Sequence, residues 1–142
     1  EEPTGALWFG TEGGLFRLER GRWEQLRPPG VEWRDVVRAF AGTPDGALWM
    51  ATTGAGLLRY KNGRFRPVTT ADGLPFDRVR SLHTDRDGWL WVGTEGRGLA
   101  RLDSREWEEG KQGGRIVSVR APDGLFDEVI HAILADDADR SG

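Results

Sequence analysis

The residues that most often carry covalent or metal chemistry are scarce in this sequence. None of its 142 residues is a cysteine, which excludes disulfides, thiolate nucleophiles and Cys-ligated zinc. The two histidines, His83 and His131, occupy different positions of a threefold repeat, and no Ser-His-Asp set, matched pair of acids or phosphate-binding loop accompanies them. We therefore predict a protein that is not an enzyme and that holds no metal and no cofactor.

Cationic side chains provide the first candidate for a ligand site. Arg38, Arg80 and His131 each follow an aliphatic residue at one and the same position of the repeat. A ring of such donors favours ligands that carry carboxylates or many hydroxyl groups. In the alternative interpretation, each cation pairs with a nearby aspartate and only fixes a loop. The aspartates close to them in the sequence are Asp35, Asp77 and Asp127.

Aromatic residues provide the second candidate. Trp33, Phe76 and Phe126 precede the three cations, in loops that we expect to share one rim of the molecule. Aromatic side chains at such a rim can bind a sugar face or a peptide side chain, although each could instead pack beneath its own loop. Two further aromatics depart from the repeat: Trp89 stands where the other copies have alanine, and Trp107 lies in an insertion.

An internal repeat of about 41 residues must position these groups. One glycine-to-threonine segment occurs three times, as GALWFGT at 5–11, GALWMAT at 46–52 and GWLWVGT at 88–94. Each copy is followed by a Gly-bearing turn, two further short segments, a Gly-centred loop and a fourth segment. In the last copy, the turn before the third segment is enlarged by an insertion at residues 103–113. Self-similarity at this period is the signature of a repeat architecture.

The segments within each repeat predict antiparallel strands. They are four to seven residues long, too short for helices, and are separated by glycine and Asp-Gly turns. Four strands in a period of 40–45 residues match one blade of a β-propeller. We therefore predict an all-β fold of three four-stranded antiparallel blades in one domain, 1–142, with repeats at about 5–45, 46–87 and 88–142. The equivalent Trp8, Trp49 and Trp91 are predicted to fill the gaps between blades as structural core.

The phase of the repeat indicates how such blades would be completed. With strands named A to D from the propeller axis outward, the chain is expected to run B-C-D, A-B-C-D, A-B-C-D, A. Three blades do not close a ring, because propellers typically have four to eight. We expect either the remaining blades of a longer protein or further copies of this chain to complete the ring.

Charge and hydropathy argue against two classes of partner. The 20 lysines and arginines and 23 aspartates and glutamates give a net charge of −3 and are interspersed along the chain, so we expect no nucleic acid. No stretch approaches the roughly 20 apolar residues of a membrane span, and the N-terminus has no targeting leader. We expect no membrane contact by this segment.

The motif at residues 72–102 carries a family resemblance. It reads Asp-Gly-Leu, then valine, then Asp-x-Asp-Gly-x-Leu-Trp-Val-Gly-Thr-x-Gly-x-Gly-Leu-x-Arg-Leu. This pattern resembles the two-component regulator propeller repeat, and the resemblance extends over nearly the whole chain. It implies a periplasmic or extracellular sensor region of a bacterial signal-transduction receptor, whose relatives sense oligosaccharides or other small ligands.

Three functions are compatible with the sequence. The first is a non-enzymatic sensor propeller that binds a small ligand, such as an oligosaccharide, on its loop face. The second is a structural propeller fragment that closes a ring by oligomerisation. The third and most distant is a propeller lyase of the streptogramin-lyase type, which would need a site centred on histidine and an acid.

Overall fold

The computed structural model describes residues 5–32 and 35–119, which form three separate antiparallel sheets. The first sheet has three strands, β1 (Leu7–Thr11), β2 (Gly14–Glu19) and β3 (Arg22–Leu26), in that order. The second has four: β4 (Val37–Gly42), β5 (Leu48–Thr52), β6 (Leu57–Lys61) and β7 (Arg64–Val68). The third has β8 (Val79–Thr84), β9 (Trp89–Thr94), β10 (Leu99–Asp103) and β11 (Ile116–Val119).

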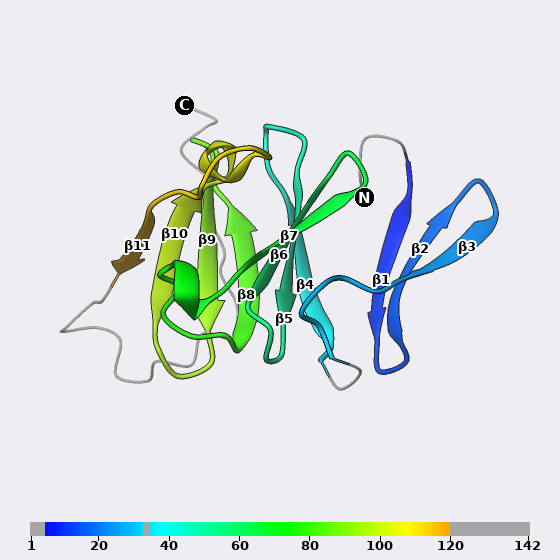
Figure 1. Cartoon of the computed structure of the whole chain (residues 1–142), viewed down its shortest axis with the longest axis horizontal. Coiled ribbons are helices and arrows are strands. Elements are labelled where there is room, and N and C mark those ends of the chain that lie inside the picture. Colours follow the sequence, from blue (N-terminus) through cyan, green and yellow to red (C-terminus); the bar gives the residue numbers. More distant parts are fainter. Residues whose placement is uncertain (1–4, 33–34, 120–142) are drawn as a thin grey trace, which may run out of the picture.

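The three sheets stand side by side like the blades of an open β-propeller (Figure 1). Their strand orders correspond to B-C-D, A-B-C-D and A-B-C-D, so the predicted all-β blade architecture is confirmed for the described residues. The expected final A strand falls outside them. Two short 3₁₀ helices, η1 (Thr70–Asp72) and η2 (Ser104–Trp107), lie in connections between strands.

Tight turns keep the outer strands in register. The β2–β3 and β6–β7 hairpins use the two-residue turns Arg20-Gly21 and Asn62-Gly63, in which both residues have positive φ. Such turns match the right-handed twist of paired strands, and glycine adopts their second position without strain. The equivalent hairpin of the third sheet, between β10 and β11, contains the insertion instead.

The core consists of two layers, each between neighbouring sheets. Trp8 and Leu15 of the first sheet pack with Leu48, Met50 and Leu58 of the second. On the opposite face of the second sheet, Trp49, Ala51 and Leu57 pack with Leu90, Val92, Ala100 and Leu102 of the third. Strand β5 is therefore buried along its whole length, because a sheet covers each of its faces.

The inner strands of the second and third sheets share one irregularity. Pairing shifts register between Val37 and Ala39 in β4, and between Val79 and Ser81 in β8. An extra residue of this kind is a β-bulge, which re-aims the side chain that it carries. The bulged residues are Arg38 and Arg80, so the repeat places both arginines in the same local geometry.

Candidate functional site

Arg38 and Arg80 converge on one carboxylate. The Nη1 atoms of the two arginines lie 3.4 Å and 3.8 Å from the same oxygen, Glu95 Oε2. Glu95 follows β9, and its backbone N–H donates to the carbonyl of Arg78, which fixes the loop beside the bulge. All three side chains are about one-third exposed. The cluster therefore joins two blades and has two cations for one carboxylate.

This geometry corrects one part of the sequence interpretation. The aspartates suggested as partners of these arginines bond elsewhere: Asp35 accepts from the backbone N–H of Glu32, and Asp77 accepts from the backbone and hydroxyl of Thr70. Asp35 and Asp77 brace loops, but they do so without the arginines. The partner is Glu95, from the loop between the second and third strands of a blade.

Phe76 lies at the same end of the sheets. Its half-buried ring is 5.7 Å from the guanidinium carbon of Arg97, which belongs to the loop that also holds Glu95. Loops from both connections thus meet at this rim. Trp33, Phe126 and His131, the other predicted ligand contacts, lie outside the described residues. Of the six predicted contacts, the structure therefore places Arg38, Arg80 and Phe76, and it brings only the two arginines onto a shared partner.

The three repeat tryptophans occupy equivalent places on β1, β5 and β9. Trp49 is fully buried and Trp8 is 9% exposed, whereas Trp91 is half-buried on the face of the third sheet that points away from the second. The indole N–H of Trp91 donates to Asp85 Oδ2 over 2.8 Å, and that of Trp49 donates to Ser104 Oγ over 2.8 Å. Trp49 and Trp91 therefore use different hydrogen-bond partners, and Trp8 Nε1 has none among the described residues.

A second polar cluster, which sequence reasoning missed, lies at the opposite end of the sheets. Ser104 Oγ donates to Asp45 Oδ2 and accepts from Trp49 Nε1 and Arg59 Nε. Asp45 and Arg59 also pair directly over 2.8 Å, with side chains only 6% and 5% exposed. The only sequence signal was the presence of an insertion, which gave no indication of where it would dock.

The rest of the insertion continues this contact onto the second sheet. Lys61 Nζ lies 2.6 Å from Glu108 Oε1, and Arg66 Nη1 donates to the carbonyls of Trp107, Glu108 and Lys111. The Trp107 side chain is 1% exposed, with the Arg66 guanidinium 5.3 Å from its ring. The insertion thus fastens the third blade to the β6–β7 hairpin of the second.

Hydrogen bonds and ion pairs lower the pKa values of the acids in this cluster. Burial alone would raise the pKa of Asp45, but hydrogen bonds from Thr43, Arg59, Ser104 and the Ala47 N–H outweigh it and lower the pKa from its ordinary 3.8 to about 2. The Arg105 guanidinium lowers the pKa of Asp103, and Lys61 lowers that of Glu108. These carboxylates are ionised at neutral pH and hold fixed partners, which suits structural roles better than proton transfer.

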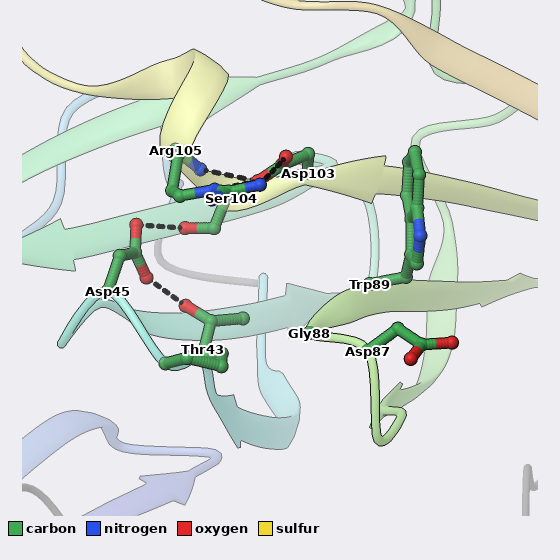
Figure 2. A pocket seen from close by; sticks show the side chains of 9 residues that line it. Thr43, Asp45, Asp87, Gly88, Trp89, Asp103, Ser104 and Arg105 are labelled. Carbon is green, nitrogen blue, oxygen red and sulfur yellow. Dashed lines mark hydrogen bonds and ion pairs between the residues drawn. The ribbon is translucent and has the colours of Figure 1, made fainter.

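A pocket of about 360 Å³ opens beside this cluster, between the second and third sheets (Figure 2). Its walls come from the β4–β5 turn, the β8–β9 turn and the first residues of the insertion.

Among the described residues, no helix is long and apolar enough to cross a membrane.

Comparison with known proteins agrees with this architecture. The sequence profile described as the two-component regulator propeller matches residues 73–96, from the loop after β7 to the loop after β9. The matched segment includes Arg80 and Glu95, two of the three members of the ion-paired cluster described above. No curated protein matches the sequence.

Solved structures share the fold at low sequence identity. The extracellular domain of a protein assigned as a hybrid two-component system from B. thetaiotaomicron superposes with a TM-score of 0.62 and 18% identity, over 83% of this chain and 16% of that one. Virginiamycin B lyase from Staphylococcus aureus gives a TM-score of 0.64 and 17% identity, over 87% of this chain and 40% of the lyase. The chain thus spans less than half of either protein, and at these identities the likeness concerns the fold.

Proposed function

We propose that this chain is part of the sensor propeller of a bacterial signal-transduction receptor, that it acts outside the cytoplasm, and that it binds ligand without catalysing a reaction. The propeller repeat at 73–96 and the likeness to an extracellular domain of a two-component system support this role. The observation that carries the proposal is the convergence of Arg38 and Arg80 on Glu95 at the rim formed by two sets of loops.

The chemistry of this rim favours a ligand that carries both carboxylates and hydroxyls. Glu95 balances only one of the two arginines, and both guanidinium groups keep donors that face solvent. Arginine binds carboxylates through charge-assisted hydrogen bonds, and carboxylates also accept from both members of an arginine pair. An acidic oligosaccharide combines these groups with hydroxyls. We therefore propose a uronate-containing oligosaccharide as the ligand class.

Calorimetric titration with tetragalacturonate, and with neutral maltotetraose for comparison, tests this proposal. We expect tetragalacturonate to bind more tightly, and Arg38→Ala and Arg80→Ala each to weaken it by about tenfold or more, as loss of a charge-assisted hydrogen bond predicts. Arg22→Ala, an exposed arginine of β3, is the matched control and should leave the affinity unchanged. Unchanged affinity in both rim variants, or no binding of tetragalacturonate, would remove the ligand assignment.

A second candidate function, self-assembly, is favoured by the open face of the first sheet. Leu7, Phe9 and Trp23 are 42%, 40% and 63% exposed, and the rings of Phe9 and Trp23 lie 5.6 Å apart. Exposed apolar clusters of this kind often mark interaction surfaces. Light scattering distinguishes this function: a stable species of about twice 15.8 kDa that Phe9→Lys and Trp23→Lys convert to monomer would support it. A monomer at all concentrations would exclude it.

A further inference from the structure

Two departures from the repeat build one pocket. Trp89 replaces the alanine found at the equivalent positions Ala6 and Ala47, and the insertion occurs only in the third repeat. Both contribute to the 360 Å³ pocket between the second and third sheets, through Trp89 and through Ser104 and Arg105. Its volume falls within the range of small-molecule sites. It lies at the end of the sheets opposite to the Arg38–Glu95–Arg80 cluster.

The back of the pocket is a preorganised polar wall. Thr43, Asp45 and Ser104 line it. Thr43 and Ser104 are 8% and 2% exposed, and the Asp45 side chain is 6% exposed. Each oxygen of Asp45 already accepts two hydrogen bonds, from Thr43 and the Ala47 N–H on one side and from Arg59 and Ser104 on the other. This wall therefore fixes the shape of the pocket and has little capacity left to bind a ligand itself.

The groups still available are a carboxylate and an indole. Of the charged residues that line the pocket, Asp45 pairs with Arg59, and Asp103 pairs with Arg105 over 2.7 Å. Asp87 has no ion-pair partner among the residues that the structure describes. Figure 2 shows the Asp87 carboxylate and the Trp89 indole on one side of the pocket, opposite Asp45, Ser104 and Arg105.

The indole of Trp89 already interacts with one cation. The guanidinium carbon of Arg101 lies 4.5 Å from its ring centroid. Arg101 is not one of the residues that line the pocket, whereas Trp89 is. An electron-rich ring beside an unpaired carboxylate attracts positive charge through both the ring quadrupole and Coulomb's law.

We propose that this pocket is a second ligand site and that its ligand is a small organic cation, held between the Trp89 indole and the Asp87 carboxylate. An anion is disfavoured because the only lining cation, Arg105, is already paired with Asp103. The site differs in both position and charge preference from the rim of the proposed sensor function.

Titration with choline, and with its uncharged isostere 3,3-dimethylbutanol, tests this proposal on the whole chain. Binding is followed by NMR through the indole N–H resonances. We expect choline to shift the Trp89 resonance saturably and to bind at least about fivefold more tightly than the isostere, as an exposed cation–π contact with one added charge pair predicts. Acetate should produce no shift of this resonance.

Variants locate the binding. Trp89→Ala restores the residue of the other two repeats, and Asp87→Asn removes only the charge; each should weaken choline by about fivefold. Trp23→Ala, at an exposed tryptophan of the first sheet, and Arg38→Ala, at the rim, should leave it unchanged. Equal binding of choline and its isostere, wild-type affinity in both Asp87→Asn and Trp89→Ala, or no saturable shift with millimolar choline would overturn the proposal.

Discussion

Single hydrogen bonds distinguish tryptophans that the repeat makes equivalent. Thr43 and Asp85 occupy the same position, three residues before Gly46 and Gly88. Asp85 accepts from the indole of its own blade, Trp91, but Thr43 instead donates to Asp45. The indole of Trp49 therefore depends on Ser104, from another blade. A buried N–H needs an acceptor, and the insertion supplies it.

Replacing Ser104 by alanine should destabilise the fold. The change removes the acceptor of Trp49 Nε1 and Arg59 Nε and one donor to Asp45, all at buried sites. Leaving such groups unpaired costs about 1–3 kcal/mol. Urea unfolding followed by tryptophan fluorescence measures the change. Ser118→Ala, at an exposed position of β11, should stay within about 0.5 kcal/mol of the wild type, and an equally small effect at Ser104 would contradict this account.

The pKa of Asp45 predicts how stability depends on acid. Its folded-state pKa, about 2, lies below the ordinary 3.8, so the charged form contributes stability above pH 4. That contribution is lost as the pH falls from about 4 through about 2, because over this range the unfolded chain, in which Asp45 has the higher pKa, takes up the proton first. The shift corresponds to roughly 2 kcal/mol. Urea unfolding at pH 5, 3 and 2 should show a steeper loss for the wild type than for Asp45→Asn; parallel losses would contradict it.

At the scale of elements, the insertion acts as a clamp between blades. Sequence reasoning located it as an enlarged turn but could not place it, because its contacts with Arg59, Lys61 and Arg66 have no counterpart in the other two repeats. The bulges of β4 and β8, in contrast, follow the repeat. Repeat alignment predicted that Arg38 and Arg80 would be equivalent, and the structure gives both the same register shift.

Periodicity explains this contrast. It identifies positions that share backbone geometry, so it predicted the strands, the blade order and the burial of Trp49. It carries no information on partners that come from loops of different length. Glu95 was consequently missed as the partner of the two arginines, and Ser104 as that of Trp49.

The contact between the insertion and the second sheet should depend on the buried Trp107 and not on the exposed ion pair between Arg64 and Glu109. Trp107→Ala removes a side chain that is 1% exposed, and such a truncation costs about 3–5 kcal/mol. Arg64→Ala breaks the pair with Glu109, in which both side chains are at least 67% exposed, and should cost less than about 1 kcal/mol. Hydrogen exchange should accelerate in β6 and β7 for Trp107→Ala alone. Equal protection in the two variants would show that the insertion does not clamp the second sheet.

At the scale of the whole molecule, the structure is a stack of sheets in which each contributes one face to each neighbour. Trp8 packs against residues of the second sheet, and Trp49 packs against residues of the third. The core layers on the two sides of β5 have no residue in common. In such a chain of nearest-neighbour interfaces, stability depends on every junction separately. The junction between the first and second sheets is the one without an insertion to support it.

Close backbone approach makes this junction sensitive to a single methyl group. A Cβ at Gly10 of β1 would collide with the backbone carbonyl of Val37 at the start of β4, which cannot move aside as a flexible side chain could. The equivalent residue of the second sheet is Ala51, which packs in the core against the third sheet, so alanine itself suits this repeat position. Gly10→Ala should therefore separate the first two sheets specifically, at a cost of about 1–3 kcal/mol or more.

Urea unfolding and NMR of the Trp8 indole measure this effect. Gly13→Ala is the matched control in the same hairpin, because its added Cβ would meet only the Thr11 hydroxyl at an ordinary 3.6 Å. We expect Gly10→Ala to lower the free energy of unfolding and to shift the resonances of Trp8 and Met50 while leaving those of Val92 and Leu102 in place. Because the two core layers meet only through the second sheet, shifts of equal size in both layers would refute independent junctions and would favour one continuous core.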